Sequence, residues 1–171
     1  DTISKIVKPN DRSTELLFGD AGTATALHRQ SGKGLSFTLG TDGSGFEHII
    51  AKDKKINDVS EKVMSSAFLE MDGGEVFKFT LESVPKMINE FLLDLKLNSE
   101  DIDACIYHQA NRFMLKHLSK KSKFTPEQVP LSIVDYGNTS SASIPLTLCS
   151  QTLNKKNKVL VGGSGPEPTY D

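Results

Sequence analysis

The chain has 171 residues, enough for one domain, and its 37% hydrophobic and 25% charged side chains are typical of a globular protein. A formal net charge of -2 provides no electrostatic field that would favour nucleic acid or an anionic membrane as a partner. No apolar stretch reaches the roughly 20 residues that span a bilayer, and the first residues resemble neither region of a signal peptide, so we expect a cytoplasmic protein.

The first third of the chain contains segments that favour strands, separated by small residues and polar loops. Small and β-branched residues predict short strands at 15–18, 23–27 and 35–39. A loop rich in glycine follows at 41–45, and the polar stretch 51–62 is interpreted as a surface excursion.

From residue 77 onward, helical and strand patterns alternate. Apolar residues spaced by three or four from Phe77 to Leu95 predict a long helix, with a kink at Pro85. The later segments are expected to be a buried strand at 102–107, a helix at 111–121, a strand at 131–134, a helix at 140–153 and a strand at 158–161. This order predicts a single α/β domain over 1–171, with a mixed sheet and helices on both faces.

Two cysteines argue against a disulfide scaffold and fit a reducing compartment. Cys105 lies in a predicted strand and Cys149 in a predicted helix, so each is interpreted as a small buried side chain. A nucleophilic cysteine needs a lowered pKa and an open approach, and neither context indicates one. The histidines lack the spacing of metal ligands, so we expect no metal.

The first candidate site is the His-Gln-Ala-Asn run at 108–111, where a predicted strand ends and a helix begins. Ligands of open α/β sheets bind beyond the carboxyl ends of strands, which favours a chemical role for His108. Asn111 can cap the following helix. The alternative, that His108 is a hydrogen-bonded histidine of the core, stays open on spacing alone.

The second candidate is the Gly-Asn-Thr-Ser-Ser-Ala-Ser-Ile-Pro run at 137–145, after the predicted strand 131–134. Asn138 can donate through its amide, although an ordinary helix cap at Asn138 or Thr139 is the simpler interpretation of this run alone. If the two runs follow neighbouring strands, the side chains of His108 and Asn138 converge. Such a pair offers two donors to a developing oxyanion.

These two runs, together with the segments 17–22 and 71–78, resemble the signature segments of the β-ketoacyl-acyl-carrier-protein synthase III group of condensing enzymes. The likeness extends over roughly 12–162. It implies a thiolase-like fold, of which this chain would be the C-terminal half. The implied reaction is the decarboxylative Claisen condensation of an acyl thioester with malonyl-carrier protein, in fatty-acid or related secondary biosynthesis.

The resemblance assigns His108 and Asn138 to binding the malonyl thioester carbonyl and stabilising the enolate. The other residues that it implicates are Ala110 and Asn111 along the pantetheine tunnel, Thr139 and Ser140 in the loop around Asn138, Gly163 and Gly165 as weak candidates for an acyl oxyanion hole, and Arg112 and Lys116 as weak candidates for carrier docking. A solvated helix face is the simpler alternative for a group of four lysines, Lys116, Lys120, Lys121 and Lys123.

The implied partners are an acyl carrier protein, acyl and malonyl thioesters of coenzyme A or carrier-bound phosphopantetheine, and a second copy of the intact enzyme. No covalently bound cofactor is implied. The family carries its nucleophilic cysteine in an N-terminal half, which we expect to be absent from this chain, since neither Cys105 nor Cys149 matches that motif. The chain alone is therefore expected to be inactive in condensation.

Four positions depart from the family pattern. Phe113 follows Arg112 where a basic residue is common, Gly74 replaces an asparagine, and prolines at 166 and 168 oppose a regular final strand. Two alternatives to condensation also stay open: acyl transfer to another acceptor without decarboxylation, and a non-catalytic docking or dimerisation domain.

Overall fold

The computed structural model describes residues 1–28, 31, 34–52, 67–151 and 158–163. The strands and α-helices of these residues are, in chain order, β1 (Ile49–Lys52), β2 (Phe68–Met71), α1 (Gly73–Asp94), β3 (Ala104–Tyr107), α2 (Arg112–Lys121), α3 (Ile133–Tyr136), α4 (Ser143–Ser150) and β4 (Val159–Gly162). Short 3₁₀ turns lie at Ile3–Lys5, Phe46–His48, Ser99–Asp101, Pro126–Gln128 and Ser140–Ala142.

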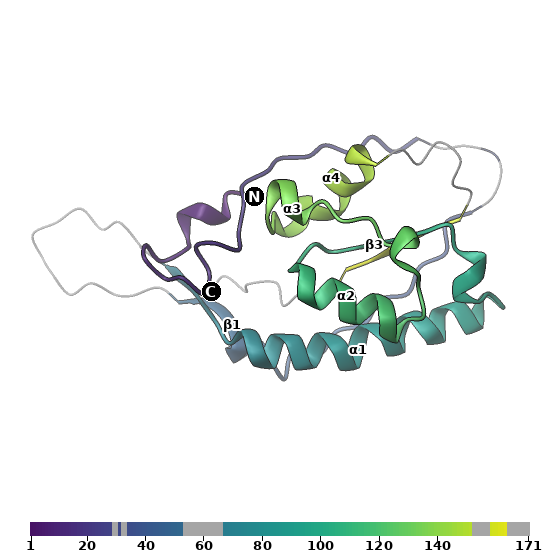
Figure 1. Cartoon of the computed structure of the whole chain (residues 1–171), viewed down its shortest axis with the longest axis horizontal. Helices are drawn as coiled ribbons and strands as arrows, with labels where there is room; N and C mark the ends of the chain where they lie inside the picture. The colour runs from purple at the N-terminus through teal and green to yellow at the C-terminus, as the bar shows by residue number, and fades with distance from the viewer. Residues whose placement is uncertain (29–30, 32–33, 53–66, 152–157, 164–171) are drawn as a thin grey trace, which may run out of the picture.

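The described strands form two pairs. β1 and β2 are antiparallel, whereas β3 and β4 are parallel, with Ala104 opposite Val159 and Tyr107 opposite Gly162. In Figure 1, α1 and α2 lie on one side of β3, and α3 and α4 lie on the other. The strand that leads to His108 is therefore covered on both faces, as the sequence predicted for a buried parallel strand.

Helix α1 confirms the long helical pattern. Its N-terminus is capped by Asp72, whose Oδ1 accepts hydrogen bonds from the N–H groups of Gly74 and Glu75 at 3.0 and 3.1 Å. The helix continues through Pro85, which is buried. Its buried aliphatic residues recur every four positions, at Val84, Ile88 and Leu92, which turns one face toward the core.

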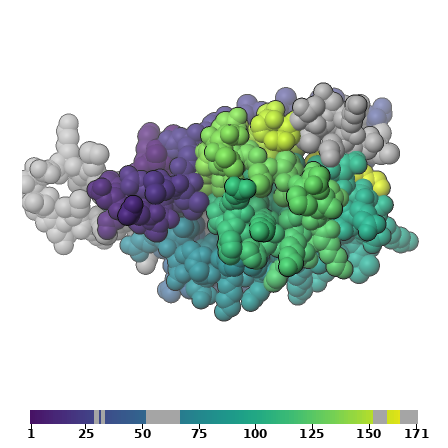
Figure 2. Space-filling model, in the orientation of Figure 1, coloured from purple at the N-terminus to yellow at the C-terminus, as the bar shows by residue number. Residues whose placement is uncertain are grey.

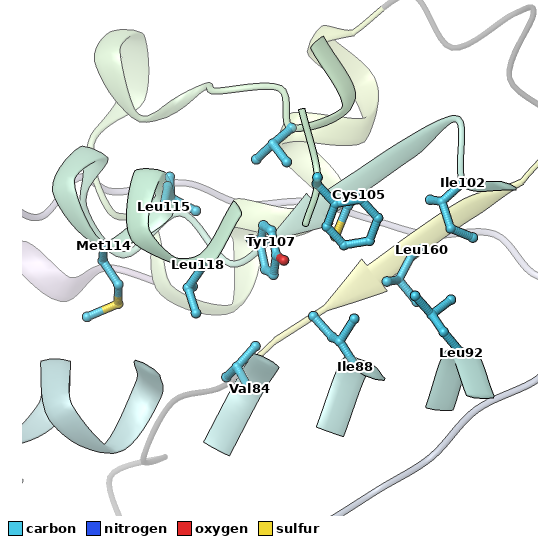
Figure 3. Close-up of a cluster of buried hydrophobic side chains, with 12 residues drawn as sticks. Val84, Ile88, Leu92, Ile102, Cys105, Tyr107, Met114, Leu115, Leu118 and Leu160 are labelled. Atoms are coloured by element: carbon cyan, nitrogen blue, oxygen red, sulfur yellow. The ribbon is translucent and has the colours of Figure 1, made fainter. Parts of the chain in front are cut away.

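The core lies between α1, α2 and the β3–β4 pair. All four residues of β3 are buried, and the side chains around them come from both helices (Figure 3). The cluster consists of Val84, Ile88, Leu92, Ile102, Cys105, Tyr107, Met114, Leu115, Leu118, Phe124, Val129 and Leu160. This packing fixes the direction of β3, and so it fixes where the residue after β3 emerges.

The predicted strand at 131–134 is wrong, because this segment leads into helix α3. Its backbone turns toward β3: the N–H groups of Ser132 and Ile133 both donate to Gln109 Oε1, at 3.0 and 3.3 Å. The predicted helix 140–153 is split into a 3₁₀ turn and α4, and its last two residues lie outside the described part of the chain. Most of the predicted excursion at 51–62 lies outside it as well.

The early strand predictions at 15–18, 23–27 and 35–39 are also not confirmed. Within these segments only Phe18 pairs, through a single parallel bridge to Asn138. A strand needs a neighbour for its backbone groups; residues 15–17 instead form turns, and residues 23–27 and 35–39 are in no regular structure. The first residues of the chain, coloured the darkest purple, lie together toward one end of the view in Figure 2. None of the described helices is both long and apolar enough to cross a bilayer.

Candidate active site

His108 is the first residue after β3. Its backbone N–H donates to Gly162 O at 2.9 Å, so it continues the β3–β4 ladder by one bond. The imidazole Nδ1 lies 2.7 Å from the hydroxyl oxygen of Ser143, the first residue of α4. Burial lowers the pKa of His108, and a contact with the Ser140 carbonyl opposes this effect in part. The imidazole is therefore neutral at neutral pH.

Asn138 is held by its backbone rather than by a strand that ends before it. Its N–H donates to Leu17 O and its carbonyl accepts from the Gly19 N–H, both at 2.9 Å. Gly137 makes this close approach possible, since its φ is 70° and a Cβ there would lie 3.2 Å from Leu17 O. The N-terminal segment thus supports Asn138, in place of the expected neighbouring strand of one sheet.

The side chain of Asn138 is oriented by Ser140. The Ser140 N–H donates to Asn138 Oδ1 at 3.0 Å, and Asn138 is 7% exposed. Among the residues that the structure describes, no acceptor is bonded to Asn138 Nδ2, which leaves its two hydrogens available. Because the Ser140 carbonyl also contacts His108, one residue joins the two predicted side chains. The two runs therefore meet through Ser140 and Ser143, whereas convergence of the His108 and Asn138 side chains on one substrate oxygen stays a prediction.

The residues next to His108 and Asn138 are placed as follows. Asn111 caps α2, since its Oδ1 accepts from the Met114 N–H at 2.7 Å. Ala110 lines a cavity of about 10 Å³ beside His108, which has room for at most one water molecule. This cavity is too small to hold a pantetheine arm. Thr139 is fully buried, with no described partner for its hydroxyl.

Three of the four weaker candidates, Gly163, Arg112 and Lys116, lie in the described part of the chain. Gly163 follows β4, so it is one residue beyond the partner of Tyr107 in the β3–β4 register, and a Cβ there would lie 3.4 Å from the Ile144 side chain. Gly165 lies outside the described residues. Arg112 and Lys116 are exposed on α2.

Sequence reasoning gave no role to Gln109. Its side chain is completely buried, and its Nε2 donates to Tyr107 O at 2.9 Å. Its Oε1 accepts from the backbone that leads into α3. Gln109 therefore fixes the end of β3 against α3. A long polar residue two positions after a buried apolar strand is the sequence signal that could have indicated this role.

The cysteines differ from each other. Cys105 is buried as predicted, and burial raises its pKa to about 12, so its thiol stays protonated at neutral pH. Cys149 is exposed, which corrects the prediction of a buried side chain. The expected helix does form around it, but position 149 faces outward because Thr147 occupies the buried side of α4.

Solved structures with a similar fold define the class of the protein. A 3-oxoacyl-(acyl-carrier protein) synthase from Burkholderia xenovorans LB400 superposes with a TM-score of 0.77 at 42% identity, covering 91% of this chain and 46% of that chain. The 3-oxoacyl-(acyl carrier protein) synthase III of Pseudomonas aeruginosa PAO1 also gives 0.77, at 29% identity, covering 97% of this chain and 52% of that one. The fold is thiolase-like, as predicted.

Sequence comparison identifies the family. The profile of the 3-oxoacyl-[acyl-carrier-protein] synthase III C terminal matches residues 92–166, and the synthase III profile matches residues 1–43. The beta-ketoacyl-[acyl-carrier-protein] synthase III of Clostridium tetani is 37% identical over 185 residues, covering 99% of this chain and 55% of that protein. A Streptococcus agalactiae synthase III is 35% identical, with the same coverage. The chain belongs to the β-ketoacyl-acyl-carrier-protein synthase III family, and it spans about half the length of these curated relatives.

Proposed function

We propose that this chain provides the enolate-stabilising half of a synthase III-type acyltransferase of fatty-acid or related biosynthesis. In this reaction the bond between the malonyl α-carbon and its carboxylate breaks, and carbon dioxide leaves. The electron pair stays as an enolate, whose carbon attacks an acyl thioester and expels its thiolate. His108 and Asn138 donate hydrogen bonds to the malonyl thioester oxygen while it carries negative charge.

The observation that supports this proposal most directly is the hydrogen bond from the Ser140 N–H to Asn138 Oδ1. This bond occupies the acceptor end of the amide and turns the donor end, Nδ2, away from it. The lowered pKa of His108 keeps the neighbouring imidazole neutral. Two neutral donors suit a site in which charge appears only during the reaction, because they stabilise the enolate without binding the malonyl carboxylate strongly beforehand.

The substrates and partners follow from the same proposal. The malonyl group arrives as a thioester of coenzyme A or of the phosphopantetheine of an acyl carrier protein, and it passes Ala110 and Asn111. Thr139 and Ser140 hold the loop that carries Asn138. Exposed Arg112 and Lys116 of α2 offer positive charge to an acidic carrier protein. Gly163 contributes a backbone N–H near the acyl oxygen.

The nucleophile belongs to another part of the intact enzyme. Cys105 is unsuited to this role by burial and by its raised pKa. We therefore propose that a cysteine of the N-terminal half carries the acyl group, that the intact enzyme is a homodimer, and that this chain alone does not condense acyl groups.

The test is incubation of the chain with malonyl-CoA, followed by mass spectrometry of the thioesters. We expect slow conversion to acetyl-CoA without any condensed product, and a rate about 10²-fold lower in His108→Ala and in Asn138→Ala. Unchanged rates in both variants would contradict the assigned pair. Transfer of an acyl group to another acceptor with malonyl-CoA intact would support the non-decarboxylating alternative, and absence of any thioester chemistry would support a docking domain.

A further inference from the structure

Ser143 carries a buried hydroxyl that contacts His108 and Gln109, the first two residues after β3. It is 1% exposed, and its Oγ lies 2.7 Å from His108 Nδ1. The backbone N–H of Gln109 also points to this oxygen, at 3.3 Å. Ser143 thus lies 35 residues from His108 in sequence and in direct contact with its ring.

The directions of these two bonds are limited by the number of hydrogens. A backbone N–H can only donate, so the Gln109 N–H takes one of the acceptor positions of the Ser143 hydroxyl. The hydroxyl has one hydrogen of its own. Among the described residues, the only acceptor bonded to it is His108 Nδ1. When the Ser143 hydroxyl donates to His108 Nδ1, the Gln109 N–H, the hydroxyl and Nδ1 all have partners. If Nδ1 donated to the hydroxyl instead, the buried hydroxyl hydrogen would have no partner.

We infer that Ser143 is a positioning residue, which holds neutral His108 in the tautomer that carries its hydrogen on Nε2. The inference rests on the proposed function, because a thioester oxygen needs a donor at this ring and Nδ1 is already engaged. In the opposite tautomer the free Nε2 would present a lone pair and would repel the enolate oxygen.

The Ser140 carbonyl is the competing group. A carbonyl can only accept, so a bond from a protonated Nδ1 to this oxygen would select the opposite tautomer. The 2.7 Å contact with Ser143 has hydrogen-bond geometry, whereas the effect of the Ser140 carbonyl on the pKa of His108 is smaller than that of burial, which keeps the ring neutral. Ser143 therefore determines the tautomer of the neutral form.

His117 provides an internal reference for the opposite tautomer. Its Nδ1 lies 2.9 Å from the Phe113 carbonyl, which can only accept, so His117 carries its hydrogen on Nδ1 when neutral. The two rings should therefore give opposite patterns in one long-range ¹H–¹⁵N NMR spectrum of the full chain, recorded at about pH 8, where neutral imidazole predominates.

The experiment is this spectrum for the native chain and for three variants. We expect Nε2–H for His108 in the native chain, a preference reduced by about tenfold in Ser143→Ala, and recovery of the pattern in Ser143→Thr, which keeps the hydroxyl. Ser119→Ala is the matched control, because it removes another buried hydroxyl, which donates to Phe124 O at 2.9 Å. It should leave the His108 pattern unchanged.

An Nδ1–H pattern in native His108, or an unchanged pattern in a folded Ser143→Ala, would overturn the inference. The native spectrum decides the tautomer even if the alanine variant fails to fold. The malonyl-CoA assay tests the proposed function separately: Nε2–H together with unaffected decarboxylation in His108→Ala would refute the function and leave the tautomer assignment intact.

Discussion

Asn138 Oδ1 accepts a hydrogen bond from the Ser140 N–H at 3.0 Å, and Ser140 makes this bond from a left-handed backbone conformation with φ of 52°. Such a conformation is unfavourable for residues other than glycine, so the surrounding fold must hold it. The conformation lets one residue direct its N–H to Asn138 and its carbonyl toward His108. A locally strained turn therefore determines which atoms of the two side chains remain free.

The first prediction separates the two ends of the Asn138 amide. Asn138→Asp keeps an oxygen for the Ser140 N–H but loses the Nδ2 hydrogens. We expect a change in the free energy of unfolding of less than about 1 kcal/mol, together with a loss of about 10²-fold in decarboxylation of malonyl-CoA. Urea denaturation and product analysis measure the two effects. Full activity in the aspartate variant would show that Nδ2 is not a donor to the substrate.

The elements that could be predicted from sequence are those that local patterns determine. α1 and α2 have apolar periodicity together with an Asp72 or Asn111 cap, and β3 is a short apolar run. The segment 131–134 has a strand-like composition, yet its backbone bends toward a side-chain oxygen of Gln109, which lies 24 residues before Ile133. No local pattern contains that contact.

The candidate site likewise combines features of local sequence with contacts between residues that are distant in sequence. His108 and Asn138 could be proposed from sequence because the motifs around them are specific. Ser143 is one small residue in a run of small residues, and its contact with His108 appears only after folding has brought the two segments together. The support of Asn138 by Leu17 and Gly19 is equally distant in sequence, so the sequence analysis placed Asn138 after a strand that does not form.

A second prediction concerns Gln109, whose buried side chain bonds to both β3 and the start of α3. Gln109→Ala removes three or more buried hydrogen bonds and leaves a cavity, so we expect it to lower the free energy of unfolding by about 3–5 kcal/mol. Gln109→Met fills the volume without the polar groups, and we expect a loss of about 2–3 kcal/mol. Chemical denaturation measures both. Equal stability of the methionine variant and the native chain would show that these bonds contribute no net stability.

A third prediction follows from the lowered pKa of His108. Unfolding returns this pKa toward 6.5, so between the folded value and 6.5 the unfolded chain binds more protons than the folded chain. The stability of the native chain should therefore fall as pH decreases through this interval, and should be independent of this group above it. We expect this fall to be absent from His108→Gln, measured by urea denaturation between about pH 5 and about pH 7.5.

The control for this measurement is His28→Gln, which removes an exposed imidazole. A difference in unfolding free energy between native and His108→Gln that stays constant with pH would contradict the assigned direction of the shift. If the native chain became more stable relative to His108→Gln as pH decreases, the pKa of His108 would be raised by folding rather than lowered.

A fourth prediction uses the end of α2. Lys123 follows the helix with φ of 60°, a position where glycine avoids the penalty of a Cβ. We expect Lys123→Gly to raise the free energy of unfolding by about 0.5–1 kcal/mol. Lys120→Gly, at an exposed position inside the same helix, removes the same side chain and should lower it by about 1 kcal/mol. Destabilisation of similar size in both variants would show that the left-handed conformation at Lys123 carries no penalty.

The last prediction concerns the segment 35–39, which was expected to be a strand. Its apolar side chains Leu35, Phe37 and Leu39 are 91%, 75% and 87% exposed, so three large apolar side chains within five residues face water. Exposed apolar surface of this kind promotes association, because contact removes it from water. We expect sedimentation velocity to show a sedimentation coefficient that rises with protein concentration.

Substituting lysine for Leu35, Phe37 and Leu39 together should abolish that concentration dependence. The matched control places lysine at Ser36 and Thr38, the exposed polar residues between them, and it should leave association largely unchanged. A native chain that sediments as a single monomer at all concentrations would refute this prediction. Equal effects of the two sets of lysines would show that added charge, rather than loss of the three apolar side chains, controls association.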